Sequence, residues 1–211
     1  SGQFFEDKGA VASVTEDNRL LMTFVMVSSS FFSDALDVSY QTVEVARLAS
    51  SVSSLELDVN QRNLIVVTID GVMSMYDVAT VDEIELIDRV SVVGPGEEVT
   101  DTKFLSSGIS LIVGSSSGEI AQWSAVRDIN NIYSLKKIRV FEPMPSGIIK
   151  IAPEYYRKGF VVVDAERNMA GYHATANKQV AFIEDIGTDP VDITICPRSK
   201  NVLVGYGNKG L

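Results

Sequence analysis

Few side chains in this sequence are of the types that carry out catalysis or bind metal ions. His173 is the single histidine, which excludes a multi-histidine metal site and any hydrolase that needs two histidines. A Ser-His-Asp triad around it is formally possible, but the sequence contains no Gly-x-Ser-x-Gly elbow. Because His173 directly follows an expected strand, we interpret it as a strand-end histidine that is satisfied by a neighbouring group.

Acidic pairs and glycine-rich stretches offer no better candidate. Glu97-Glu98, Asp82-Glu83 and Glu184-Asp185 stand in turn-like or strand-end contexts, where solvated loop charge is the simpler explanation. No calcium-binding loop of the D-x-D-x-D-G kind occurs. The glycine-rich stretches at 94–98 and 205–210 lack both the phosphate-binding pattern and a following helix. We therefore expect no catalytic, cofactor-binding or metal-binding residue, no cofactor and no enzymatic activity.

Charge and cysteine content limit the partners further. The net charge of −10 disfavours a nucleic-acid partner, because nucleic-acid affinity comes mainly from Lys and Arg that neutralise phosphates, and it disfavours an anionic membrane surface. No apolar run of about 18 residues or more occurs, so we expect no membrane span in this chain. Cys196 is the only cysteine, so no internal disulfide can form. It alternates with Ile193 and Ile195, and we expect a buried small hydrophobe rather than a reactive thiol.

Some features leave alternatives open. Phe31 and Phe32, beside three serines, either pack beneath the core or form an exposed docking point. The basic stretches at 135–139 and 156–159 are either polar edges and turns or contacts for an acidic partner. The chain begins with Ser1-Gly2, which resembles the remainder of a removed tag, so we expect a piece of a longer protein.

The elements that position these residues follow a repeat of strand, turn and strand. The repeat starts at Leu64, Leu111, Phe160 and Leu203, roughly 40 to 50 residues apart. In most copies a glycine stands at the turn and an aromatic residue near the end of the second strand. We expect these positions to be structural: Gly71, Tyr76, Gly118, Trp123, Tyr172 and Gly210.

The turn residues support this interpretation. Asp70-Gly71 and Ser117-Gly118 are hairpin dipeptides, since glycine accepts a positive φ without a Cβ clash. Glu166-Arg167 stands at the same point of the third copy, and Asn18 marks a weaker copy near the start. The inner-strand residues at one shared repeat position are expected to be buried. These residues are Val66, Ile112 and Val162.

A repeat of this length with four expected strands per unit is typical of a β-propeller blade. We predict an all-β fold, a β-propeller-like (WD40-like) arc of about four four-stranded antiparallel blades that is complete or part of a larger propeller. The Trp-Asp signature is not kept, since only Tyr76-Asp77 retains the acid. The chain is expected to form a single domain over 1–211, with units at about 1–49, 51–93, 95–142, 145–186 and 188–211.

The two ends allow two arrangements. In a closed ring, the strand at Arg19 to Phe24 would pair with the strand at Val202 to Tyr206. In an open arc, the edge near Val202 to Tyr206 would stay unpaired, and the chain would self-associate because exposed edges template pairing. We expect the open arc.

Part of the sequence resembles a known family. The region 115–180 is similar to the large soluble insertion of long-form bacterial phosphate ABC-transporter permease subunits of the PstC type. The remainder matches only loosely, and Asn177-Lys178 departs from the more basic or histidine-bearing continuation of that pattern. The matching residues are Gln122-Trp123, Val126-Arg127-Asp128, Ile138-Arg139-Val140-Phe141, Arg157-Lys158-Gly159-Phe160 and Tyr172-His173-Ala174-Thr175-Ala176.

This resemblance implies a location and a role. The parent protein would lie in the bacterial inner membrane, and this domain would lie in the periplasm. It would be an accessory interaction or regulatory surface without chemistry of its own, in contact with the transmembrane part of the same permease. Other transporter subunits or the phosphate-binding protein are further expected partners. The repeat alone equally fits a stand-alone propeller scaffold unrelated to transport, whereas a propeller lactonase or glycosidase lacks the residues it would need.

Overall fold

The computed structural model describes residues 2–5, 9–29, 36–58, 62–79, 83–105, 110–154, 157–199 and 201–207. These residues form β-strands, turns and bends, and none of them is helical. The expected all-β fold with almost no helix is therefore confirmed. Phe31, Phe32, Asp82 and Gly210 lie outside the described residues.

The strands form four four-stranded sheets and one two-stranded sheet, in which strands pair antiparallel with their neighbours in the chain. The first sheet contains β1 (Gly2–Phe5), β2 (Ala10–Val14), β3 (Arg19–Ser29) and β4 (Leu36–Arg47); the second contains β5 (Val52–Leu57), β6 (Asn63–Thr68), β7 (Val72–Asp77) and β8 (Glu85–Ser91). The third contains β9 (Val99–Phe104), β10 (Ser110–Ser115), β11 (Ile120–Arg127) and β12 (Tyr133–Val140); the fourth contains β13 (Ile148–Pro153), β14 (Gly159–Asp164), β15 (Met169–His173) and β16 (Lys178–Ile183). The fifth contains β17 (Pro190–Ile195) and β18 (Val202–Tyr206).

The same tight turn joins the second and third strands of each four-stranded sheet. The last residue of the turn has a positive φ and donates its backbone N–H to the backbone oxygen of the residue three positions earlier. The residues that donate in this way are Asn18, Gly71, Gly118 and Arg167. The hairpin turns predicted from the sequence are thereby confirmed. A Cβ at Gly71 would lie 2.3 Å from Val93 Cγ2, and one at Gly118 would lie 2.4 Å from the Met144 oxygen. Glycine is thus needed at these two turns for space as well as for φ.

A second recurring contact fastens each sheet to the segment that follows it. The backbone oxygen of the turn residue accepts an N–H from the chain just after the fourth strand. The donor and acceptor pairs are Leu48 with Asn18, Val92 with Gly71, Met144 with Gly118 and Ile186 with Arg167, at 2.8 to 3.0 Å. The chain therefore leaves each sheet at the same place.

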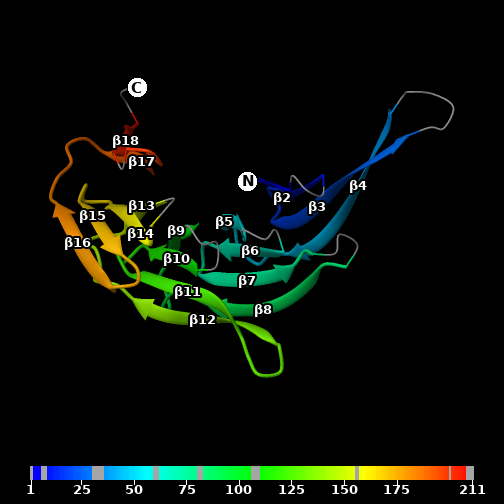
Figure 1. Cartoon of the computed structure of the whole chain (residues 1–211), viewed down its shortest axis with the longest axis horizontal. Coiled ribbons are helices and arrows are strands. Elements are labelled where there is room, and N and C mark those ends of the chain that lie inside the picture. The colour runs from blue at the N-terminus through cyan, green and yellow to red at the C-terminus, as the bar shows by residue number, and fades with distance from the viewer. Residues whose placement is uncertain are drawn as a thin grey trace.

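The sheets pack face to face in chain order, with their first strands side by side. β1 contacts β5, β5 contacts β9, β9 contacts β13 and β13 contacts β17. Figure 1 shows these strands on the concave side of an arc and the last strands, such as β8, β12 and β16, on its outside. The core is divided accordingly into four apolar clusters, one between each pair of successive sheets. Val66, Ile112 and Val162 are buried in them, as predicted.

Among the residues that the structure describes, the two ends of the arc are not joined by strand pairing. Arg19 to Phe24 of β3 pair with β2 and β4, while β18 pairs with β17. Among the described residues, the strand pairing of the closed-ring alternative is thus absent.

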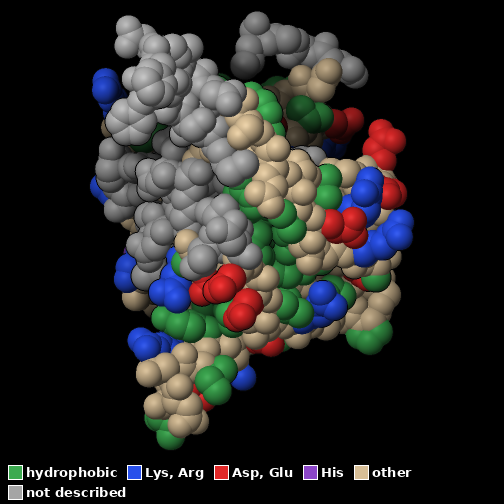
Figure 2. All heavy atoms as spheres, turned by 90° about the vertical axis from the view of Figure 1, so that its right-hand side faces the viewer, with side chains coloured by type: hydrophobic (Ala, Val, Ile, Leu, Met, Phe, Trp, Pro, Cys, Tyr) green, Lys and Arg blue, Asp and Glu red, His purple; other side chains and the backbone are tan. Residues whose placement is uncertain are grey.

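Figure 2 views the side of the molecule formed by the right-hand end of the arc. On this side, Lys and Arg side chains stand beside Asp and Glu instead of forming a patch of one sign.

No described segment forms a helix long and apolar enough to cross a membrane.

Candidate functional site

The aromatic residues of the repeat occupy one structural position. Tyr76, Trp123 and Tyr172 lie directly opposite the first residue of their repeat, which is Leu64, Leu111 or Phe160. Each ring is buried against the preceding sheet; Trp123 is 6% exposed. In the first sheet the equivalent residue is the half-buried Thr23, which explains why that copy is weak in the sequence.

A hollow of about 200 Å³ adjoins Trp123 between the second and third sheets. Its floor is apolar and includes Ile65, Met73 and Leu111, while Asp58 stands at its polar rim. The Asp58 carboxylate already accepts bonds from two backbone N–H groups and one amide side chain. The hollow therefore offers a mainly apolar surface, to which Ser124 and Tyr133 add hydroxyl-bearing side chains.

Some of the residues that carry the family resemblance lie between the third and fourth sheets, whereas Trp123 packs between the second and third sheets and Val126 is 40% exposed. The rings of Phe141, Phe160 and Tyr172 form one cluster, with centroids 5.1 to 5.9 Å apart. Arg139 Nη1 donates to the backbone oxygens of Ala174 at 2.6 Å and Thr175 at 3.2 Å. Aromatic packing and an Arg–carbonyl clamp thus tie β12 to the turn between β15 and β16.

The Tyr172 hydroxyl completes this cluster. It donates to the backbone oxygen of Glu142 at 2.9 Å and accepts a bond from Gln179 Nε2 at 3.2 Å. Burial raises the pKa of Tyr172, so the phenol stays protonated and remains a donor at neutral pH. The Ala174 N–H donates to the Lys158 oxygen at 2.7 Å. These hydrogen bonds hold the participating residues in place, and none of these residues presents a reactive group.

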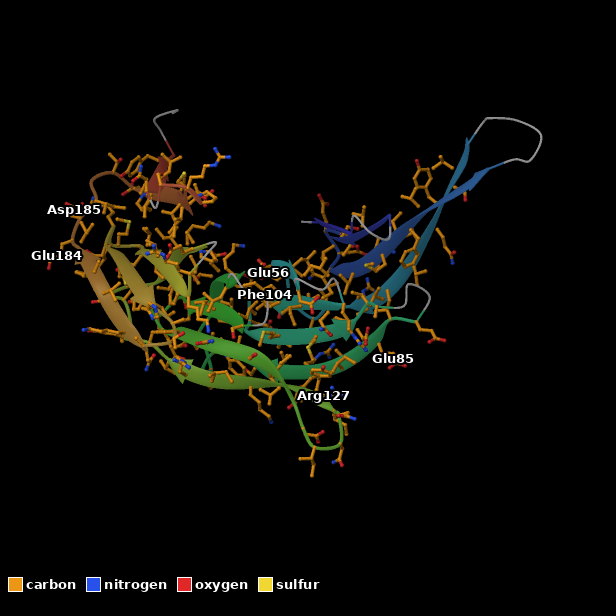
Figure 3. All side chains as sticks on the ribbon, viewed as in Figure 1. Glu56, Glu85, Phe104, Arg127, Glu184 and Asp185 are labelled. Carbon is orange, nitrogen blue, oxygen red and sulfur yellow. The ribbon has the colours of Figure 1, made fainter. Side chains whose placement is uncertain are left out.

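Charged side chains of the first strands form a second cluster, on the concave side of the arc. Lys103 Nζ lies 2.9 Å from Glu56 Oε1 and 3.9 Å from Asp101 Oδ1, which joins β5 to β9. Asp101 Oδ2 accepts the Ile151 N–H at 2.8 Å, which joins β9 to β13. Figure 3 shows Glu56 and Phe104, labelled, close together near the middle of the arc.

Burial governs the electrostatics of this cluster. Desolvation raises the pKa of both Glu56 and Asp101, although the nearby Lys103 charge acts in the opposite direction. For Lys103 burial lowers the pKa, but attraction to Glu56 and Asp101 outweighs burial and the net direction is upward. Among the described residues, no group of three or more His, Cys, Asp and Glu could hold a metal ion. The cluster is a polar link between three sheets rather than a metal centre.

The sequence signal for this link was missed. Glu56 and Lys103 stand at the same position of consecutive repeat units, since Leu57 pairs with Leu64 and Phe104 with Leu111. Opposite charges at one repeat position predict an ion pair between neighbouring sheets, because the first strands of successive sheets lie side by side.

The other chemically interesting residues are placed as follows. His173 Nδ1 accepts the Ala176 N–H at 3.2 Å, in agreement with the predicted strand-end role. Cys196 is exposed, so the expected burial is wrong. Successive strand residues point to opposite faces, and because Ile193 and Ile195 pack against the fourth sheet, Cys196 just beyond β17 does not. Glu184 and Asp185 are exposed beyond the end of β16 (Figure 3).

Comparison with known proteins adds no family to this geometry. No protein-family model matches the chain, and no curated protein matches it. The candidate site is thus described by its packing alone. It comprises the aromatic cluster, the charged link and the apolar hollow beside Trp123, each located between successive sheets.

Proposed function

We propose that this chain is an accessory protein-interaction domain of a phosphate ABC-transporter permease of the PstC type, with no chemistry of its own. In this proposal the parent protein lies in the bacterial inner membrane and the domain lies in the periplasm. Its partners are the transmembrane part of the same permease, together with other transporter subunits or the phosphate-binding protein.

One observation carries the proposal: several of the resembling residues pack against one another. Arg139, Phe141, Phe160, Tyr172 and Ala174 come from separate stretches of sequence, yet they meet at one interface between sheets. Residues that share one structural task are what a family pattern retains, so we infer likeness of fold from this part of the resemblance.

The arrangement of sheets supports a β-propeller-like, WD40-like arc. Each sheet is a simple antiparallel series, the first strands lie together and the sheets stack face to face, as the blades of a propeller do. Four units have four strands each and the fifth has two. Such arcs present extended surfaces without an enclosed active site, which suits an interaction role. A fold by itself does not fix a function, so the transport role depends on the resemblance.

The parent reading frame tests the transport role directly. We expect a hydrophobic span of about 20 residues within a few tens of residues upstream of Ser1, followed further on by the remaining permease helices. A parent without flanking transmembrane helices would contradict the proposal and favour a stand-alone propeller scaffold.

A deletion tests the accessory role. In the parent permease, residues 2–207 are replaced by a short Gly/Ser linker, and phosphate uptake is measured together with co-purification of the phosphate-binding protein. We expect assembly of the transmembrane part to persist while partner recovery or regulation of uptake changes. Unchanged recovery and uptake would show that the domain serves neither.

A further inference from the structure

Two hollows between the second and third sheets meet at one side chain. The inner one is the apolar hollow beside Trp123. The outer one, of about 410 Å³, lies near the turn between β11 and β12. Tyr133 lines both hollows, and Arg62 of the outer one directly precedes Asn63 of the inner one. The other residues that line the outer hollow are Asp77, Leu86, Ile87, Arg127, Asn131 and Ile132. We call the two hollows together the Tyr133 slot.

The inner end of the slot is apolar and formed by buried residues. Ile65, Met73 and Leu111 are each at most 4% exposed. Ala125 of β11, which pairs with Leu135 of β12, also lines it, and its small side chain leaves space that a larger residue would fill. An apolar hollow of this kind excludes water and binds small apolar molecules. Its walls belong to the second and third sheets, which have a sheet on either side, so they do not depend on the chain ends.

The outer end of the slot holds a cation without an anionic partner among the described residues. Arg127 pairs with Tyr133 across the β11–β12 hairpin, and its guanidinium carbon lies 5.7 Å from the centroid of the Tyr133 ring. Figure 3 shows Arg127, labelled, where this hairpin begins to project from the body of the arc. The carboxylates nearby have other partners. Asp77 Oδ2 lies 3.2 Å from Arg62 Nη2, and Asp128 Oδ1 accepts two N–H groups of its own turn at 2.8 Å.

We propose that the Tyr133 slot binds a small apolar molecule that carries one carboxylate. The apolar part lies in the hollow beside Trp123, and the carboxylate pairs with the Arg127 guanidinium. A guanidinium suits this group because it can donate two parallel N–H bonds to a carboxylate. Apolar burial supplies most of the affinity, and the ion pair fixes the orientation.

The charges around the slot limit the ligand to a single negative charge. Asp58 lines the inner hollow and Asp77 the outer one, and both carboxylates repel a second anionic group. The ligand class is therefore an apolar monocarboxylate rather than a phosphate ester or a dicarboxylate. This inference goes beyond the proposed interaction role and does not depend on it.

The experiment follows the indole N–H of Trp123 by nuclear magnetic resonance. Because Trp123 is the only tryptophan, it gives a single indole cross-peak in a proton–nitrogen correlation spectrum. The probe is 4-phenylbutanoate, and the control probe is its uncharged amide, 4-phenylbutanamide. The acid should shift the cross-peak saturably with a Kd of about 1 mM or lower, as suits a ligand of about a dozen non-hydrogen atoms. The amide should bind at least threefold more weakly.

Variants locate the two ends of the ligand. Arg127→Gln should weaken binding of the acid at least threefold and leave binding of the amide unchanged. Its control, Lys136→Gln, removes the same charge from an exposed position outside the slot and should affect neither probe. Ala125→Leu should weaken binding of both probes at least tenfold because it fills the inner hollow. Val126→Leu, at the next residue of β11 and on the opposite face, should leave both unchanged.

Several results would overturn the inference. The site itself would be refuted if the acid caused no saturable shift up to about 10 mM, or if Ala125→Leu left binding intact. Equal affinity for acid and amide, or equal effects of Arg127→Gln and Lys136→Gln, would refute the role of the carboxylate. A dimer in light scattering that the acid dissociates would show that a second copy of the chain occupies the slot. None of these results bears on the permease proposal, which the parent reading frame decides.

Discussion

Tyr76 and Tyr172 hold the same repeat position but differ in what their hydroxyl groups contact. The Tyr172 hydroxyl donates to the Glu142 oxygen and accepts from Gln179 Nε2. The buried Tyr76 hydroxyl has no hydrogen-bond partner among the described residues. We therefore predict opposite effects when each tyrosine is changed to phenylalanine.

The magnitudes follow from the balance between hydrogen bonding and desolvation. An intramolecular hydrogen bond contributes about 0.5–1.5 kcal/mol net, so Tyr172→Phe should lower the free energy of unfolding by roughly 1–2 kcal/mol. A buried hydroxyl without a partner costs about 1–3 kcal/mol, so Tyr76→Phe should leave the free energy of unfolding unchanged or raise it by up to about 1 kcal/mol. In a chain of this size 1 kcal/mol corresponds to a Tm shift of roughly 2–4 °C.

Urea unfolding followed by circular dichroism measures both effects, with Trp123 fluorescence as a second probe because it is the only tryptophan. The two rings belong to different apolar clusters, so the double variant should show additive changes. Equal destabilisation by both substitutions would refute the reasoning, and so would a neutral Tyr172→Phe.

Further predictions concern the core, the charged link and ligand binding. Trp123→Ala should lower the free energy of unfolding by roughly 3–5 kcal/mol, and an unchanged Tm would show that the ring is not a packing residue. Burial raises the pKa of Asp101 and Glu56 in the folded state. Their contribution to stability is therefore fully present below their pKa values in the unfolded chain, which lie near 4. It is lost as the pH rises through their pKa values in the folded protein. Asp101→Asn should make this fall of stability with pH shallower, which measurements of the free energy of unfolding from pH 4 to pH 7 would show. An unaltered slope would contradict the role given to Asp101. Gly118→Ala should be strongly destabilising, because its Cβ would lie 2.4 Å from the Met144 oxygen. A Tm close to that of the parent protein would disprove this. Calorimetry should detect no micromolar phosphate binding to the domain, whose charge is −10; a saturable isotherm would overturn this.

The repeat made much of the fold predictable. Gly71 and Gly118 mark turns that need a positive φ, and alternating apolar residues mark the strands around them. Arg167 adopts the same positive φ without the glycine signal, so only its spacing revealed that turn. The first unit was weak in the sequence because Thr23 replaces the aromatic residue.

The candidate site was less predictable, because its residues meet only through stacking of sheets. Phe141 lies just beyond one sheet and Phe160 belongs to the next, and no local pattern shows that their rings touch. The error at Cys196 has a local cause: Ile193 and Ile195 face the fourth sheet, so strand alternation places Cys196, just beyond β17, on the opposite face. The ion pair of Lys103 with Glu56 could have been found by comparing charges at equal repeat positions.

Each of the four apolar clusters joins only successive sheets, and each turn residue fastens its own sheet to the next segment. Stability in such an array approximates a sum of nearest-neighbour interface terms. Removing a terminal sheet takes away one such term and leaves the others intact, whereas disrupting a middle sheet breaks two. The fold is therefore modular along its length: evolution can add or delete whole units at either end without redesigning the centre, and local opening should spread inward from the ends.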